Sequence, residues 1–192
     1  LERPNSGHVA DNGNFSIEDW HFGDGLIGTF YVFSAAGKQL IKRKFKANLY
    51  NSAISGSGHF AVCQTANSPG EDDGNRLTAF DVEGNAQLFS INPPSGWANS
   101  YVFDEASGKI GVVLDGIGTF YYDRQGQFLD ADKLDLARLN SDRYAEVLMA
   151  AEQMLKRTDL NEDLAQAALN AAQRACGIGA DNDLSWKAVV LK

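Results

Sequence analysis

The sequence predicts a mainly β protein with a C-terminal α part, and three observations carry that prediction. An extended run, a four-residue reversal and a second extended run occupy residues 75–89, which is the pattern of a β-hairpin. A tight turn with glycine, followed by a strand-like run, recurs three times before residue 130. After Asp130 the apolar spacing changes from that of strands to that of helices.

The reversal in 75–89 has residues suited to a turn at both ends. Asp81 opens it, because a carboxylate can accept hydrogen bonds from backbone amides further along the turn. Gly84 is predicted to close it in a left-handed backbone conformation. An aromatic residue, a small polar residue, two free positions and glycine follow the same spacing at 33–37 and 122–126.

Two sets of glycines recur together along the chain. Gly13, Gly58 and Gly108 lie in the tight turns, at intervals of 45 and 50 residues. The glycines that close the three reversals recur at intervals of 47 and 42 residues. Such a shared period predicts structural repeats with several short strands each.

Each repeat is predicted to hold four strands, bounded by turn residues and recognised by alternation. The predicted strands are 7–10, 15–19, 26–33 and 39–46, then 52–55, 60–65, 76–81 and 86–91, then 100–104, 110–114, 118–123 and 127–129.

Apolar residues at helical spacing predict a helical hairpin near the end of the chain. Its first helix contains Tyr144, Val147, Leu148, Ala151 and Leu155, and its second contains Leu160, Leu164, Ala167, Ala168, Ala171 and Ala175. Asp159 with Glu162 is typical of a helix start, and Gly177 is predicted to end the second helix. A third helix is predicted from Asp183 onward, with Trp186 and Val190 on one side.

The repeats at 7–130 resemble β-propeller blades of the WD40-like or quinoprotein-like type, and the helices resemble a tetratricopeptide-like hairpin. The resemblance implies three four-stranded antiparallel blades in 1–130, an incomplete ring, and a helical region in 131–192. No Trp-Asp dipeptide closes a strand, so the family stays undetermined. Propellers use about four to eight blades. We therefore expect a longer parent chain with more blades, partner chains that complete the ring, or an open arc of sheets.

The composition limits the classes of function that this chain can have. The formal net charge of −8 argues against a nucleic-acid binder, whose surface is usually basic. The exception, Lys42, Lys44 and Lys46 on one strand face, is interpreted as protection of an exposed edge, with a polyanion site as the alternative. No apolar run approaches the roughly 20 residues that span a bilayer. Cys63 and Cys176 are predicted to be free buried thiols, which favours a reducing, cytoplasmic location.

We also expect the natural N-terminus to lie upstream of Leu1 and a helical array to continue past Lys192.

The loops at one end of the predicted blades are the candidate surface for a ligand or partner, because loops on a rigid scaffold carry recognition. The candidate residues are Asp19, Trp20, His21, Asp24, Glu71, Asp72, Asp73 and Trp97. Glu18, Asp19, His21 and Asp24 also suit a divalent cation or an acid/base pair, the alternative being that they only solvate a loop.

We predict a non-enzymatic protein-interaction or assembly platform, with no catalytic residue, cofactor or metal. The alternative is an enzyme or a small-ligand or metal binder that uses the acidic loops, with a hydrolase-like enzyme acting on a sugar or lactone as one form of it. A third possibility is a module that self-associates through open blade edges.

Overall fold

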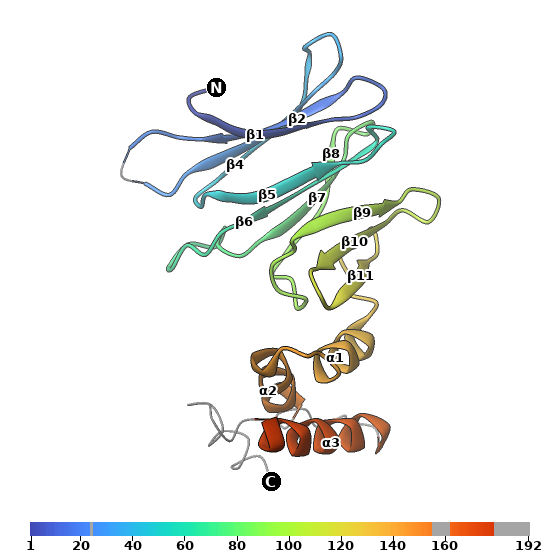
Figure 1. Ribbon diagram of the computed structural model, residues 1–192. Coiled ribbons are helices and arrows are strands. Elements are labelled where there is room, and N and C mark those ends of the chain that lie inside the picture. The colour runs from blue at the N-terminus through green and yellow to red at the C-terminus, as the bar shows by residue number, and fades with distance from the viewer. Residues whose placement is uncertain (24, 155–161, 179–192) are drawn as a thin grey trace. The chain divides into compact units, whose positions relative to one another are not determined.

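The computed structural model describes residues 1–23, 25–154 and 162–178, with the side chains of Tyr144 and of residues 175–178 outside that description. The chain forms two compact units: one holds residues 1–114 and 119–129, and the other holds 115–118 with the helices. Figure 1 shows three antiparallel sheets and three helices. The predicted class, mainly β with a C-terminal α part, is confirmed.

Each sheet is a meander in which consecutive strands pair with each other. The first sheet contains β1 (Pro4–Val9), β2 (Phe15–Trp20), β3 (Gly28–Phe33) and β4 (Gln39–Phe45). The second contains β5 (Leu49–Ile54), β6 (Phe60–Thr65), β7 (Leu77–Asp81) and β8 (Ala86–Ile91). The third contains β9 (Ser100–Asp104), β10 (Lys109–Leu114) and β11 (Gly118–Tyr122).

The third sheet differs from the prediction because it has three strands where four were expected. The segment predicted as its last strand, 127–129, contributes one isolated bridge between Tyr122 and Phe128. The chain then enters helix α1 at Ala131, so no residues remain to extend a ladder.

The turn in the 75–89 hairpin also differs from the prediction. Gly84 is not left-handed; Asn85 is, with φ 50°. The Gly84 N–H instead donates to Asp81 Oδ1 at 2.8 Å. Asparagine tolerates the left-handed region better than most residues, so the bend moves one residue along. In the other two repeats the glycine has the predicted conformation, with φ 78° at Gly37 and 83° at Gly126.

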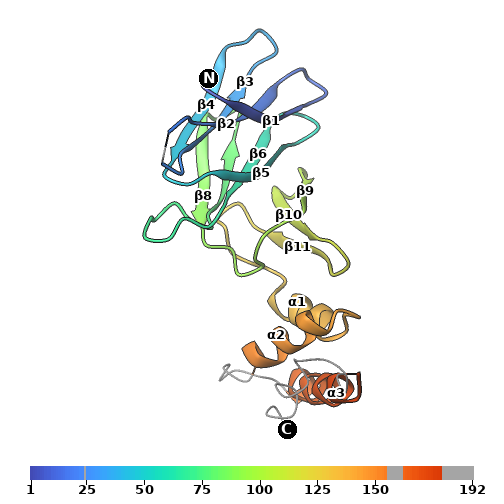
Figure 2. The same cartoon turned by 60° about the vertical axis from the view of Figure 1, so that its left-hand side comes forward.

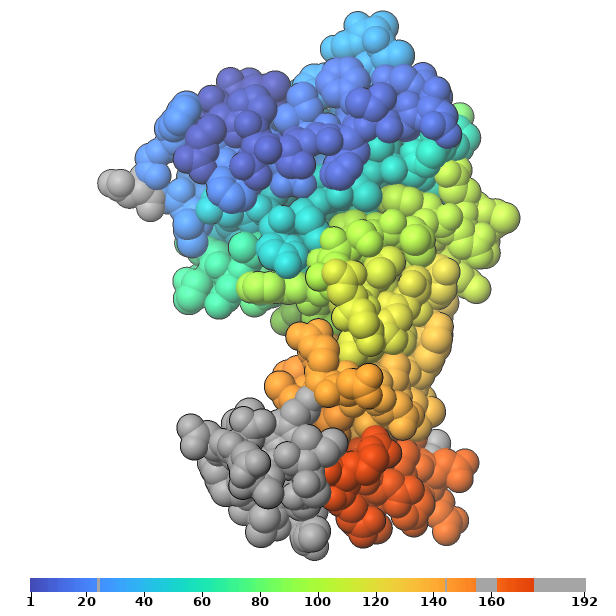
Figure 3. Space-filling view, viewed as in Figure 1, coloured from blue at the N-terminus to red at the C-terminus, as the bar shows by residue number. Residues whose placement is uncertain are grey.

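The first two sheets pack face to face around an apolar core. Their shared cluster consists of Phe30, Val32, Ile41, Phe45, Leu49, Ala61, Cys63, Phe80 and Val82. The Phe30 and Phe80 rings stack with centroids 5.6 Å apart. Figure 3 shows the surfaces of the two sheets, blue and cyan, in continuous contact. Cys63 is a free, fully buried thiol, as predicted, and burial raises its pKa well above the ordinary value.

Strand β5 joins the three sheets, because it contacts β1 and β2 on one side and β9 on the other (Figures 1 and 2). Ser52 donates to Glu18 Oε1 of the first sheet at 2.7 Å. Asn51 accepts a hydrogen bond from the Tyr101 hydroxyl of the third sheet at 2.6 Å, and Gln64 Oε1 is a second acceptor at 3.3 Å. Sheets stacked with their first strands side by side are propeller-like blades.

The helical unit has three described helices where a hairpin was predicted: α1 (Ala131–Leu139), α2 (Tyr144–Met154) and α3 (Glu162–Ile178). Their core contains Leu139, Val147, Leu148, Ala150, Ala151, Met154, Leu164 and Ala171. Arg174 of α3 donates to the Leu139 carbonyl at 2.7 Å and satisfies the end of α1. Gly177 lies inside α3 and does not end it.

Several predicted helical features lie outside the described residues. They are Leu155, Asp159, Leu160, the side chains of Ala175 and Cys176, and the third helix with Trp186 and Val190. None of the helices that the structure describes is long and apolar enough to cross a bilayer.

The link between β5 and β9 generates the first testable prediction. We expect Tyr101→Phe to lower the free energy of unfolding by about 1–3 kcal/mol, because Asn51 Oδ1 loses its donor at a largely buried junction. Urea unfolding of the full chain would measure this. Tyr50→Phe is the matched control: Tyr50 is 44% exposed, and its change should stay within about 0.5 kcal/mol. Equal effects would contradict the assigned role of Tyr101.

Candidate functional site

The predicted candidate residues lie at the end of the sheets that carries the longer connections. In a meander, the β2–β3 and β6–β7 loops emerge at the same end as the links between sheets, and we call this end the loop end (residues 21–27, 46–48, 66–76 and 92–99). Backbone contacts join its parts: the Ala66 N–H donates to the Asn48 carbonyl at 2.8 Å. The Ser68 hydroxyl donates to the Lys46 carbonyl at 3.1 Å.

Asp19 and His21 hold the start of the chain against the first sheet. The Asp19 side chain is buried, and its carboxylate accepts the backbone N–H of Glu2 at 3.0 Å and of Arg3 at 2.7 Å. His21 Nε2 lies 2.8 Å from Thr29 Oγ1, and His21 Nδ1 lies 3.2 Å from Glu2 Oε1. Both side chains are therefore engaged by the chain itself.

Trp20 lies beside them, and the Arg3 guanidinium is 5.3 Å from the centroid of its ring. The indole Nε1 of Trp20 is buried and has no hydrogen-bond partner among the described residues. Asp24, the fourth candidate in this loop, lies outside the described residues.

Glu18 does not join Asp19 and His21, although it precedes Asp19 in the sequence. Successive side chains of a strand point to opposite faces, so Glu18 faces the second sheet and bonds to Ser52. Only 2% of Glu18 is exposed, and burial raises the pKa of its carboxyl, an effect that the Ser52 bond partly offsets. The acid/base or metal-binding set of Glu18, Asp19 and His21 is not assembled.

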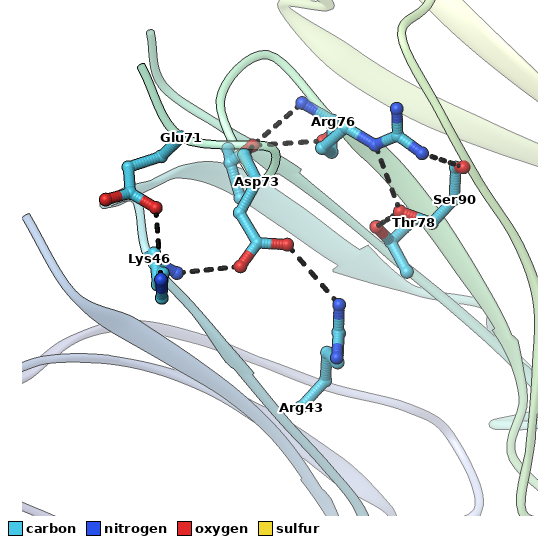
Figure 4. A network of polar contacts seen from close by, with 8 residues as sticks. Arg43, Lys46, Glu71, Asp73, Arg76, Thr78 and Ser90 are labelled. Carbon is cyan, nitrogen blue, oxygen red and sulfur yellow. Dashed lines mark hydrogen bonds and ion pairs between the residues drawn. The ribbon is translucent and has the colours of Figure 1, made fainter. Parts of the chain in front are cut away.

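The acidic loop after β6 is tied to the first sheet through Asp73 and Glu71 (Figure 4). Asp73 Oδ2 accepts the Lys46 backbone N–H at 2.9 Å, and Asp73 Oδ1 lies 3.3 Å from Arg43 Nη2. Glu71 Oε2 lies 3.3 Å from Lys46 Nζ. The neighbouring Asp72 is exposed. The contacts of Asp73 and Glu71 therefore make this loop part of the junction between the first and second sheets.

The other half of the same network anchors the loop to the second sheet. The Thr65 hydroxyl donates to the Asp73 carbonyl at 2.5 Å and accepts the Arg76 N–H at 2.8 Å. The Arg76 guanidinium donates to the carbonyl and hydroxyl of Ser90, as Figure 4 shows. In the part of the chain that the structure describes, no three His, Cys, Asp or Glu side chains form a group that could hold a metal ion.

Trp97 is a predicted residue that the structure leaves accessible, and it has a partner that sequence reasoning missed. Its ring packs against Tyr50 with centroids 5.0 Å apart, while 46% of Trp97 and 44% of Tyr50 stay exposed. Trp97 Nε1 donates to Asn75 Oδ1 at 2.9 Å. Asn75 has φ 56°, and its amide also donates to Asn67 at 3.3 Å.

Tyr50 is exposed because the register between β5 and β6 shifts there. Leu49 pairs with Thr65 and Asn51 pairs with Gln64, which leaves Tyr50 as an extra residue turned out of the ladder. The signal available in the sequence was a bulky aromatic residue directly after a leucine, two residues before the predicted strand 52–55. We call Trp97 and Tyr50 the aromatic pair. Asn75 holds the indole of Trp97 in place.

Comparisons with known proteins show no family for this chain. No protein-family model matches the sequence, and no curated protein matches it either. Similar solved structures include the propeller of Dos1, with a TM-score of 0.47 and 11% identity, covering 66% of this chain and 32% of that chain. The β-propeller domain of the Trilobed protease from Pyrococcus furiosus has a TM-score of 0.46 and 13% identity, covering 66% and 41%.

A eukaryotic initiation factor is similar with a TM-score of 0.41 and 15% identity, covering 64% of this chain and 29% of that chain. The chain thus spans less than half the length of each of these structures. These likenesses carry no argument about what this chain binds or does.

The role of Asp73 can be tested against its neighbour. We expect Asp73→Ala to lower the free energy of unfolding by about 1–2 kcal/mol, because a part-buried carboxylate that bonds the Lys46 N–H and pairs with Arg43 is lost. Asp72→Ala removes the same charge one residue away and should change stability by less than about 0.5 kcal/mol. Urea unfolding of both variants measures the difference, and equal destabilisation would refute the assigned network.

Because burial raises the pKa of Glu18, we predict how the stability of the fold changes with pH. A raised pKa in the folded state means that stability is highest while Glu18 is protonated and falls as pH rises above the ordinary value of about 4.3. Glu18→Gln keeps an acceptor for Ser52, so we expect the variant to be more stable than the parent at neutral pH and equal to it in acid.

Glu105 supplies a control of opposite sign for that measurement. Its hydrogen bonds with Ser57 lower the pKa of Glu105, so its contribution is present above the ordinary value and lost as pH falls. We therefore expect Glu105→Gln to be less stable than the parent at neutral pH. Urea unfolding across pH would measure both differences, and a pH-independent Glu18→Gln difference would contradict the burial argument.

Proposed function

We propose that this chain is a non-enzymatic platform for protein recognition, and that the aromatic pair at the loop end is its principal contact for a protein partner. The single observation that carries the proposal is the exposure of two rings in contact, Trp97 and Tyr50, with the indole held by a hydrogen bond to Asn75.

Large aromatic residues contribute most to protein interfaces when they are both accessible and rigid. Trp97 meets both conditions, because Asn75 fixes its indole and Tyr50 supports one face of its ring. Less rotamer freedom is then lost on binding, which lowers the cost of association. The remaining candidates Asp19, Trp20, His21, Glu71, Asp72 and Asp73 stay a predicted surface around it.

The state of the acidic side chains favours recognition over the enzymatic alternative. A general base or a metal ligand needs a carboxylate that is free to meet substrate or ion. The Asp19 carboxylate accepts two backbone amides, and Asp73 bonds to Lys46 and Arg43. Their negative charge instead holds segments of the chain together.

The helical unit extends the same proposal. Leu136, Met149 and Leu169 are exposed apolar residues on α1, α2 and α3. We propose that the helices serve as a tetratricopeptide-like part of the platform that supplies further contacts, and that the protein works in the cytoplasm.

A peptide selection tests the aromatic pair. The full chain, immobilised, is used to select binders from a random peptide library, and selected peptides are then titrated against Trp97→Ala and Val9→Ala. We expect binding to weaken by tenfold or more in Trp97→Ala, since interface hot spots contribute about 2 kcal/mol or more. Val9, 77% exposed in β1, is a matched apolar control that should leave affinity unchanged.

Quenching of tryptophan fluorescence that occurs in the parent and is lost in Trp97→Ala would show contact at the loop end. The proposal is wrong if selection yields no peptide whose affinity depends on Trp97, or if Val9→Ala weakens binding as much.

A further inference from the structure

The two junctions between neighbouring sheets are built differently at the end opposite the loop end. We call this the turn end; it carries the β1–β2, β3–β4, β5–β6, β7–β8 and β9–β10 turns and the turn that follows β11. Between the second and third sheets, Arg124 bridges the junction, and 45% of its side chain stays exposed. Its Nη2 lies 3.1 Å from Asp81 Oδ2, and its guanidinium carbon lies 5.3 Å from the centroid of the Phe60 ring.

The aliphatic part of Arg124 lies against Gly108. A Cβ added at Gly108 would meet Arg124 Cδ at 2.7 Å, so the glycine leaves room for the arginine. In this junction a guanidinium side chain thus runs along a glycine turn and ends on a carboxylate.

The repeat spacing identifies the equivalent positions between the first and second sheets. Arg124 follows Asp123 in the third reversal as Val82 follows Asp81 in the second, and Gly58 is the counterpart of Gly108. Val82 is too short to cross the junction as Arg124 does. A cavity of about 220 Å³ lies there, lined by Asn12, Asn14, Leu40, Gly58, His59, Val82 and Glu83. In this junction the side-chain amide of Asn12 lies against Gly58, and the space beyond it, toward Val82, is open.

The lining of this cavity suits the two parts of an arginine side chain. Leu40 and the buried Val82 offer apolar surface for methylene groups. Asn12, Asn14 and His59 add polar atoms around it. The lining contains no lysine or arginine, and Glu83 has no ion-pair partner among the residues that the structure describes. A planar cation with several donors matches a carboxylate beside amide and imidazole groups.

We propose that this cavity is a binding site for the guanidinium group of an arginine side chain presented by a protein partner. The inference rests on the proposed function only in taking the partner to be a protein. The cavity lies at the turn end, so a failure here leaves the aromatic pair at the loop end untouched, and the reverse also holds.

The test uses the full chain labelled with ¹⁵N and a glycine-serine peptide with one central arginine. We expect the amide resonances of Gly58, His59 and Glu83 to shift in a saturable way. The same peptide with citrulline, which is neutral and nearly isosteric, should not shift them. Acetyl-arginine amide is titrated in parallel, and it should bind more weakly than the peptide if a polypeptide is the natural source of the group.

Glu83→Gln is the variant that decides the result, because Glu83 is exposed and its replacement should not disturb folding. We expect it to weaken the arginine peptide about tenfold, as for the loss of one charge-assisted hydrogen bond. Glu162→Gln makes the same charge change at an exposed position of the helical unit and should leave affinity unchanged. The site assignment is overturned if citrulline binds equally or if Glu83→Gln has no effect; equal affinity for acetyl-arginine amide overturns the protein source.

A second variant closes the cavity from inside the protein. Ser34→Asp with Val82→Arg places at this junction the same residue pair that Asp81 and Arg124 form at the other. We expect the double variant, if folded, to lose its response to the arginine peptide. A folded variant that binds the peptide with the affinity of the parent would overturn the proposal. If it does not fold, the Glu83→Gln titration settles the matter.

Discussion

The alternation of side chains along β5 is the constraint on which the sheet unit depends. Ser52 points to the first sheet and bonds to Glu18, while the adjacent Asn51 points to the third sheet and bonds to Tyr101. A strand gives successive residues to opposite faces, so one strand can join two neighbours at once. A slip of one residue in β5 would exchange these two faces and break both junctions together. The extra residue, Tyr50, is where the register of β5 is adjusted.

The loop end is a consequence of this arrangement. The shift at Tyr50 turns its ring outward, and the link from the second to the third sheet brings Trp97 against that ring. The nearby carboxylates of Asp19 and Asp73 stabilise the fold. Asp19 accepts hydrogen bonds from backbone N–H groups at the start of the chain, and Asp73 accepts one from the Lys46 N–H just after the first sheet. The carboxylates of Asp19 and Asp73 are thus engaged within the chain, whereas the rings of Trp97 and Tyr50 stay accessible at this end.

The two junctions show how one repeat can give different surfaces. Both align a glycine turn with the reversal of the same repeat, yet one is closed by Arg124 and the other keeps a cavity beside Val82. The difference comes from valine at the position equivalent to Arg124 and from Asn12, whose amide lies against Gly58, on a backbone arrangement that the repeats share. Variation of this kind adds a site without altering the packing of the sheets, because the apolar core between the first two sheets is built from other side chains such as Phe30 and Phe80.

The sequence by itself determined the order of the strands through β11, the hairpin spacing and the change to helices, because alternation and turn residues act over a few positions. It placed the starts of two strands too late, since β1 begins at Pro4 and not at residue 7, and β5 begins at Leu49 and not at residue 52. It missed α1, a short helix with a weak apolar pattern, and placed the left-handed turn residue at Gly84 where Asn85 holds it. Only the tertiary structure decided that Glu18 bonds to Ser52 of the second sheet while Asp19 bonds to the start of the chain. It also decided that Asp73 pairs with Arg43. Those pairings join residues far apart in the chain, and the stacking of whole sheets sets which of them come within reach.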